Sequence, residues 1–319
     1  MSKSDGSMGT KAPPNHFLDI HNIKREELSA LVASARAMKK LTKGAPKATR
    51  HAERPLDGCL VALIFERAST RTRVSFDAAI RQLGGDALLL SADEMQLGRG
   101  ETVADTARVL SRYADALMIR ARSHDALTEL AHHADIPVIN GLTDMSHPCQ
   151  LLCDMVTIEE HLGRIEGIKV AWLGDGNNVL NSLLHAAGQF RFDVSIACPG
   201  NMTPSADAVR FARDQGVSVE LGTDAHTAVD EADVVMTDTW VSMNQTALEE
   251  RRSALARFQV TQEIMAKAKP GAIFMHCLPA HRGEEMSADV IDGPQSVVWD
   301  QAENRLHGQK AILRWCLGR

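Results

Sequence analysis

Two patterns of hydrophobic and polar positions alternate along the first half of the chain. Apolar residues at helical spacing predict helices over 25–41, 71–85, 101–113 and 124–134. Short continuous apolar runs, which are typical of buried strands, occupy 58–65, 86–91, 114–121 and 135–140. Strands that alternate with helices form parallel sheets covered on both faces, so this half predicts an α/β unit.

The same alternation starts again after residue 165. Apolar runs that predict strands lie at 168–176, 193–199, 232–240 and 272–280, and helical patterns lie at 177–190, 204–216 and 301–319. A chain of 319 residues is long for one hydrophobic core, so two domains are expected. The predicted fold is α/β, with two domains that each contain a parallel β-sheet flanked by helices and that are joined by interdomain helices.

The domain boundaries are placed where this pattern changes. Residues 1–15 are polar and contain Pro and Gly, which predicts a flexible tail. The first domain is expected at 16–148 and the second at 149–300, with the hinge near 145–165. The final helix, 301–319, is expected to pack back on the first domain.

The composition excludes several classes of protein. With 35 basic and 41 acidic side chains the net charge is -6, which argues against a nucleic-acid binder, because such a protein needs a basic face. No apolar run reaches the roughly 18 residues of a membrane-spanning helix, and the chain starts without the apolar core of a secretory signal. The six cysteines are scattered without a CxxC pair, which favours free thiols and a cytoplasmic protein.

Candidate chemistry begins at residues 65–76, "FERASTRTRVSF", where a polar cluster joins a predicted strand to a predicted helix. Ser69 or Thr70 can cap the helix, and Arg71 and Thr72 lie in its first turn. Unpaired N–H groups and arginine side chains at a helix N-terminus suit a phosphate group. The alternative is a capped surface helix whose arginines only meet solvent.

Further polar residues follow other predicted strands. Gln96 and Arg99 lie in a glycine-containing loop, Arg120 ends a strand, and His147 and Gln150 precede an apolar helix. Each of these is ordinary alone. The carboxyl ends of parallel strands meet at one edge, so together these residues predict a single crevice rich in positive charge and hydrogen-bond donors.

Four ordered motifs resemble those of the aspartate/ornithine carbamoyltransferase family: "STRTR" at 69–73, "HPCQ" at 147–150, "DTWVSM" at 238–243 and "HCLP" at 276–279. The last two motifs favour the ornithine branch of that family. The resemblance extends from residue 16 to residue 307. It implies a first domain that binds carbamoyl phosphate, a second domain that binds L-ornithine, and the products L-citrulline and phosphate.

The resemblance also implies roles for individual residues and for a homotrimer in which a neighbouring subunit supplies Gln96. The residues implied to bind carbamoyl phosphate are Ser69, Thr70, Arg71, Thr72, Gln96, Arg120, His147, Gln150 and Arg305. The residues implied to bind L-ornithine are Asn178, Asp238, Ser242, Met243, Cys277 and Leu278. Arg120, His147 and Cys277 are implied as catalytic residues, and no cofactor or metal is expected.

Carbamoyl transfer makes specific demands on such a site. Attack by an amine builds negative charge on the carbamoyl oxygen, which donors from Thr72, Arg120 and His147 can stabilise. The side-chain amine of ornithine resembles that of lysine, with a pKa of about 10.4, so presenting it neutral at pH 7 costs about 4.6 kcal/mol unless the crevice lowers that pKa. Cys277 is expected to position this amine and not to act as a nucleophile, although it also fits a buried hydrophobic role.

Two other kinds of site fit the sequence less well. "GDGNNV" at 174–179 resembles the start of a dinucleotide-binding turn, but Val179 occupies the third glycine position and no acidic residue ends the strand at 193–199. His276, Cys277 and His281 suggest a metal site, yet neighbouring strand residues face opposite sides, so His276 and Cys277 are not expected to share an ion.

Two other functions remain open at this point. One is a carbamoyltransferase for a different amine, such as aspartate, putrescine or an N-acylated ornithine, and the other is a catalytically inactive binding paralogue. Asn244 stands where the family usually has glycine, and this difference bears on the choice of amine. Asn tolerates a positive φ better than most residues, so the turn can be kept.

Overall fold

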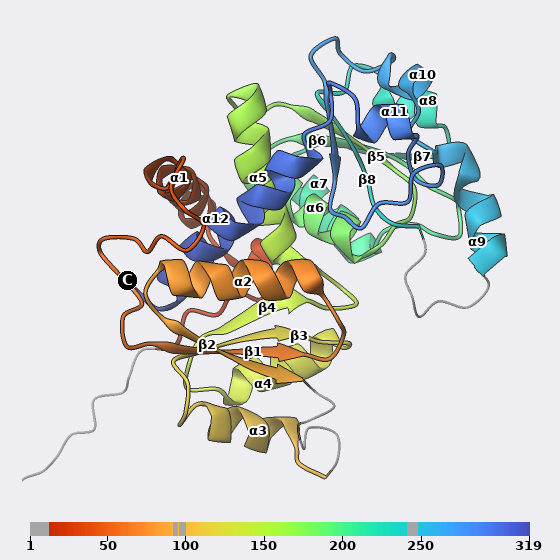
Figure 1. The fold of residues 1–319 in the computed structure, drawn as a ribbon. Helices are drawn as coiled ribbons and strands as arrows, with labels where there is room; N and C mark the ends of the chain where they lie inside the picture. The colour runs from red at the N-terminus through yellow and green to blue at the C-terminus, as the bar shows by residue number, and fades with distance from the viewer. Residues whose placement is uncertain (1–12, 92–94, 96–99, 241–247) are drawn as a thin grey trace, which may run out of the picture.

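The computed structural model describes residues 13–91, 95, 100–240 and 248–319, which form two parallel β-sheets flanked by helices (Figure 1). The first twelve residues of the predicted tail lie outside this range. The α/β fold with two sheets is confirmed. Among the described residues, no helix combines the length and the apolar character that a bilayer-spanning segment needs.

The first sheet has four parallel strands in the order β2-β1-β3-β4. Its strands are β1 (Leu60–Phe65), β2 (Asp86–Ser91), β3 (Ala116–Arg120) and β4 (Val138–Leu142). Helix α2 (Thr70–Gln82) covers one face, and α3 (Val103–Leu110) and α4 (His124–His133) cover the other (Figure 1). Alternate residues of β1 enter separate cores, because successive side chains of a strand point to opposite faces.

The second sheet has five parallel strands in the order β7-β6-β5-β8-β9. Its strands are β5 (Lys169–Leu173), β6 (Asp193–Ala197), β7 (Val219–Gly222), β8 (Val234–Thr237) and β9 (Ile273–His276). Trp172 of β5 packs in the core that includes α6 (Asn178–Phe190) and α7 (Ala206–Asp214). Leu173 packs in the opposite core with α8 (Ala225–Val229), α10 (Gln262–Met265) and α11 (Ala288–Ile291). Helix α9 (Leu248–Leu255) precedes α10 in the chain.

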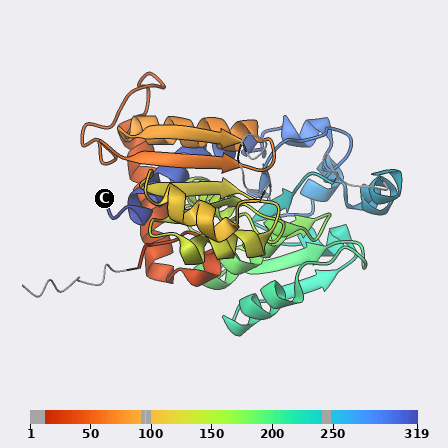
Figure 2. The same cartoon turned by 90° about the horizontal axis from the view of Figure 1, so that it is seen from below.

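Two long helices lie between the sheets (Figure 1): α5 (Pro148–Leu162) and α12 (Val298–Cys316). Helix α12 packs against α5, α2 and the N-terminal helix α1 (Arg25–Leu41). The view from below shows the C-terminal end of α12 near the N-terminal segment (Figure 2). The chain therefore returns to its start, and α12 begins at Val298, earlier than its apolar pattern alone indicates.

The pattern of apolar residues missed one strand. Strand β7 forms the edge of the second sheet, and only Val219 of its four residues is buried. Because an edge strand with one buried residue has neither a continuous apolar run nor a regular alternation, its sequence carries little strand signal. The short helices α8, α10 and α11 were also not predicted, since each has only four or five residues.

Candidate active site

Both sheets reverse their strand order beside polar residues. In the first sheet the reversal lies between β1 and β3, where the start of α2 and Arg120 are found. In the second sheet it lies between β5 and β8, where Asn177 and Asp238 follow the strands. Crevices at such reversals, outside the carboxyl ends of the strands, are the usual ligand sites of open α/β sheets.

The N-terminus of α2 has the form expected for an anion site. Ser69 caps the helix, and its hydroxyl accepts from the Thr72 N–H at 3.4 Å and bonds the Thr72 hydroxyl at 3.0 Å. Arg71 is partly buried, whereas Arg73 is exposed and Thr70 is exposed at the helix start. The first turn therefore presents free N–H groups and one inward arginine to the crevice.

The N-terminus of α5 enters the same crevice. His147 occupies the N-cap position of this helix without a side-chain capping bond, and Pro148 is at the first helical position, as the sequence predicted for that proline. The His147 N–H donates to the Ser182 hydroxyl at 2.8 Å, and its Nδ1 is buried without a partner among the described residues. Burial lowers the pKa of His147 well below its usual range, and repulsion from Arg305 and Arg120 lowers it further. The imidazole is neutral at pH 7 and offers one N–H as a donor.

Arg305 of α12 joins these two helix ends. Its guanidinium donates to the Thr72 hydroxyl at 2.8 Å and to the Gln150 side-chain oxygen at 2.5 Å. Arg305 is only 4% exposed, so these contacts fix its position inside the protein. Burial, with repulsion from Arg305 as the next cause, lowers the pKa of Arg120 to about 10, so Arg120 keeps its charge at neutral pH.

Asp154, a buried carboxyl group that the sequence analysis missed, accepts hydrogen bonds from the side chains that adjoin Arg305 and His276. Gln150 and Gln301 each donate to one oxygen of Asp154 at 2.8 Å, and Gln301 also accepts the His276 N–H at 2.9 Å. Burial raises the pKa of Asp154 to about 7. An Asp inside an otherwise apolar helix, four positions after Gln150, was the available signal, because acidic residues are almost never buried without partners.

The second unit supplies a carboxylate and a thiol. Asp238 accepts from the Cys277 thiol, the Asn177 amide and the Thr239 N–H, each at 2.7 Å. Burial raises the pKa of Cys277 well above its usual range, and the adjacent Asp238 raises it further. The thiol is therefore a neutral hydrogen-bond donor and is poorly suited to act as a nucleophile at pH 7.

Asn178 and Leu278 complete the described part of this side. The Asn178 amide donates to the Thr143 carbonyl at 2.7 Å, which connects α6 to the loop before α5. Leu278 has a positive φ of 57° and is followed by a cis peptide bond to Pro279.

The two halves interact across the crevice. Burial lowers the pKa of Arg71, and repulsion from Arg305 lowers it too. The nearby Cys277 and Asp238 act in the opposite direction and raise the pKa of Arg71. Arg71 comes from the first sheet's helix and Asp238 from the second sheet, so the cationic half and the carboxylate half face each other. Gln96, Ser242 and Met243, together with Arg99 and Asn244, lie outside the described residues.

One expectation about metal ligands needs correction. Ligand atoms of Asp238, His276 and Cys277 all lie within 4.8 Å of one another. Cys277 follows the last residue of β9, so the alternation of strand side chains no longer separates it from His276. The His276 Nδ1, however, accepts the Leu278 N–H at 2.9 Å. That the reaction uses no metal stays a prediction.

Comparison with known proteins gives consistent matches over both parts of the chain that carry these residues. The family model described as "Aspartate/ornithine carbamoyltransferase, carbamoyl-P binding domain" matches residues 15–160, and the one described as "Asp/Orn binding domain" of the same family matches residues 166–316. The ornithine carbamoyltransferases of Ruegeria pomeroyi and Paracoccus denitrificans are each 56% identical over 306 residues, which is 95% of this chain and 99% of theirs.

Solved structures match as well. An ornithine carbamoyltransferase from Pyrococcus furiosus has a TM-score of 0.90 and 48% identity, over 97% of this chain and 99% of that one. An anabolic ornithine carbamoyltransferase from Campylobacter jejuni has a TM-score of 0.85 and 39% identity, over 95% of this chain and 98% of that one.

Proposed function

Because this chain belongs to the aspartate/ornithine carbamoyltransferase family, we propose that it transfers the carbamoyl group of carbamoyl phosphate to the side-chain amine of L-ornithine. The products are L-citrulline and phosphate. The observation that carries the proposal is the pairing of a cationic helix N-terminus, with Arg71 and Arg305, and an acidic group, Asp238, across one crevice. A dianionic donor and a cationic amino acid need these opposite charges.

In this proposal residues 16–148, with α12 packed back on them, bind carbamoyl phosphate. Ser69, Thr70, Arg71 and Thr72 hold the phosphate at the N-terminus of α2, where free N–H groups and the helix dipole favour an anion. Gln96 of a neighbouring subunit completes the phosphate site. Gln150 and Arg305 orient the donor, because each is fixed by buried hydrogen bonds.

The carbamoyl carbon is the reacting centre. The ornithine amine attacks it, the bond from that carbon to the phosphate oxygen breaks, and the proton that the amine loses passes to the departing phosphate. Negative charge that builds on the carbamoyl oxygen is stabilised by Arg120, by the neutral His147 and by Thr72. Removing one such donor from an enzyme typically lowers kcat by about 100- to 1000-fold.

Residues 149–300 bind ornithine. Asp238 receives the α-ammonium group, and Asn178, with Ser242 and Met243, holds the carboxylate end. Cys277 and Leu278 lie beside the side-chain amine, and the thiol positions that amine while remaining protonated. The positive charges of the nearby Arg71 and Arg120 lower the pKa of the ornithine side-chain amine. This helps to present that amine in its neutral, nucleophilic form.

The assembly and the cellular role belong to the same proposal. The edge strand β2 exposes Leu88 by 40% and Leu89 by 36%, and such a strand at a sheet edge is suited to contact another subunit. This supports a contact between subunits, which the proposed homotrimer requires. Six free cysteines, five of them buried, support a cytoplasmic enzyme. The relative from Campylobacter jejuni is described as anabolic, which supports a role in arginine biosynthesis.

The direct test is citrulline formation from carbamoyl phosphate and L-ornithine, run beside N-acetyl-ornithine, putrescine and L-aspartate as competing amines. Strong preference for L-ornithine supports the proposal and shows that Asn244 is compatible with it. Preference for another amine would assign the chain to a different carbamoyltransferase. No turnover with any amine would favour the inactive binding paralogue.

A further inference from the structure

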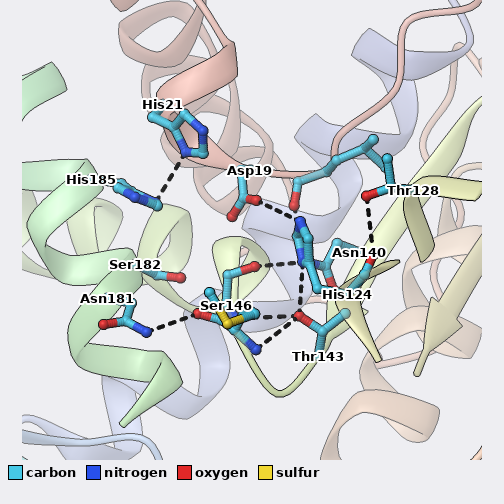
Figure 3. A network of polar contacts seen from close by, with 12 residues as sticks. Asp19, His21, His124, Thr128, Asn140, Thr143, Ser146, Asn181, Ser182 and His185 are labelled. Atoms are coloured by element: carbon cyan, nitrogen blue, oxygen red, sulfur yellow. Dashed lines mark hydrogen bonds and ion pairs between the residues drawn. The ribbon is translucent and has the colours of Figure 1, made fainter. Parts of the chain in front are cut away.

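A second cluster of chemically active side chains lies away from the crevice, where the N-terminal segment meets helix α6 (Figure 3). His21 lies in the short 3-10 helix η1 (Ile20–Asn22), and Asp19 is the residue before that helix. His185 lies in α6. One ligand atom of each lies within 4.8 Å of the other two. The reaction proposed above uses none of these three residues.

The two imidazoles lie side by side, with their ring centroids 4.1 Å apart. The Nδ1 atoms of His21 and His185 lie 3.1 Å apart, and the rings are tilted by 55°. Two imidazole nitrogens on one tetrahedral zinc ion, each bound at about 2.0–2.1 Å, lie about 3.3 Å apart. The observed nitrogen separation is close to this value, and a rotation of the two rings would direct both nitrogens at one ion.

A carboxylate oxygen is free beside them. Asp19 is 3% exposed, and its Oδ1 is buried outside the hydrogen-bonding geometry of any described residue, although the nearby Ser146 hydroxyl favours the charged carboxylate. An unpaired buried acceptor of this kind costs free energy, and coordination of a cation would offset that cost. Its other oxygen, Oδ2, lies 3.3 Å from the Nε2 of His124.

The surrounding residues orient these ligands. His124 also contacts the Thr143 hydroxyl through Nδ1 at 3.0 Å, so its ring is held at both nitrogens while it faces Asp19 (Figure 3). The Gln189 amide donates to the His21 carbonyl at 3.2 Å, which ties the segment to α6. Groups that hold the ligands of a metal in this way usually change its affinity by about 10- to 100-fold when they are mutated.

The two imidazoles are in the state that metal binding requires, whereas burial raises the pKa of Asp19, an effect that a bound cation would oppose. Burial lowers the pKa of His21 and lowers that of His185 to about 3, so both imidazoles are neutral at pH 7, as metal binding requires. The ring of Phe211 packs against both imidazoles at 5.5 Å and 5.4 Å between centroids, which limits water on that side. Both histidines are partly exposed, so an ion can enter from solvent.

We propose that Asp19, His21 and His185 form a binding site for a divalent ion of the zinc class, with a water molecule as the fourth ligand. Two nitrogens and one carboxylate oxygen suit zinc and its neighbours among the transition metals, and do not suit magnesium or calcium. The ion bridges the segment before α1 to helix α6, so it links the two parts of the chain that carry the opposite halves of the crevice.

The test uses the full-length protein after treatment with a chelator. Zinc is titrated calorimetrically, and cobalt(II) is titrated while the visible spectrum is recorded. We expect one equivalent of zinc to bind and to raise the melting temperature, because an ion that binds only the folded state stabilises it. Cobalt at this site should give visible d–d bands without the near-ultraviolet thiolate band that ligation by Cys277 produces.

Variants separate this site from the thiol. The Cys277→Ser protein should keep the one equivalent and the spectrum. His21→Gln and His185→Gln should each weaken zinc binding at least 10-fold, and His124→Gln should weaken it about 10- to 100-fold. His161→Gln, which changes a partly exposed histidine outside the cluster, is the matched control and should bind like the wild type.

The proposal is overturned if His21→Gln and His185→Gln bind zinc as tightly as the wild type, or if binding disappears in Cys277→Ser alone. In either case the two histidines form only a hydrogen-bonded pair. The melting temperatures of the metal-free variants identify any that fail to fold. His124→Gln leaves all three ligands in place, so it tests the site even if a ligand variant is unstable.

Discussion

The guanidinium of Arg305 donates to the hydroxyl of Thr72 over 2.8 Å, although 233 positions separate the two residues in the chain. The contact attaches the last helix, α12, to the first turn of α2, where the sequence predicts a phosphate. The crevice is therefore closed by a residue near the C-terminus. Several measurable consequences depend on this contact and its neighbours.

Arg305→Met should lower kcat/KM for carbamoyl phosphate by about 10- to 100-fold, because hydrogen bonds made by a charged group are each worth about 1.5–3 kcal/mol. The measurement is steady-state kinetics with ornithine saturating. Arg314→Met, on the same helix near its end, is the control and should stay within about twofold of the wild type, since surface ion pairs are weak. Equal losses in both variants would mean that helix α12 itself had been damaged.

Arg71→Met and Arg73→Met form a second pair, two positions apart on one helix. Arg71 is partly buried and interacts with Arg305, whereas Arg73 is exposed. We expect Arg71→Met to raise the KM for carbamoyl phosphate by about 10-fold or more, and Arg73→Met to change it by less than about twofold. A larger effect at Arg73 would place the phosphate on the other side of the helix.

Cys277→Ser should retain turnover. A serine hydroxyl can donate to Asp238 as the thiol does, so the main effect should be a change in the KM for ornithine of about 10-fold or less. No covalent carbamoyl-enzyme should be seen by mass spectrometry after mixing with carbamoyl phosphate. Complete loss of turnover, or a trapped adduct in the wild type, would mean that the thiol reacts covalently.

Asp154→Asn should change how stability depends on pH. The pKa of Asp154 is about 7 in the folded protein against 3.8 ordinarily, so between these values the unfolded chain ionises while the folded one stays protonated. The carboxyl therefore lowers the free energy of unfolding as pH rises from about 4 to about 7, by at most about 4 kcal/mol, and its contribution is constant above that range.

Urea denaturation at several pH values measures this effect. As pH rises to about 7, the free energy of unfolding of the wild type should fall relative to that of Asp154→Asn. Above about pH 7 the difference between the two free energies should stay constant. Asp86→Asn changes an exposed carboxyl on strand β2 and serves as the control. A difference that does not depend on pH would show that Asp154 is already ionised throughout.

Leu88→Asp and Leu89→Asp test the assembly. Both leucines are exposed on the edge strand β2, so a charge there should oppose contact between subunits. Light scattering should then report a smaller particle. Activity should also fall if a neighbouring subunit supplies Gln96. Leu221→Asp is the matched control, because Leu221 is 45% exposed on the edge strand β7 of the other sheet. An unchanged mass in all three variants would remove β2 from the interface.

Much of the fold could be predicted because its signals are local. The helix over 25–41 and strands β1 and β5 have patterns that depend on neighbouring residues, and they formed as predicted. The cap made by Ser69 was visible for the same reason, since a cap and its first turn lie within four residues. Strand β7 was missed because sheet neighbours, and not its own residues, keep it extended.

The sequence alone determined the alternation of strands and helices, the motifs at the starts of α2 and α5, and the family. It did so because these features depend on residues a few positions apart. The tertiary structure alone decided the order of the strands in each sheet, the contact of Arg305 with Thr72, the burial of Asp154 and the approach of His21 to His185. These features form only when distant segments pack together. The free energy of that packing depends on residues from several segments, so no short stretch of the chain predicts it.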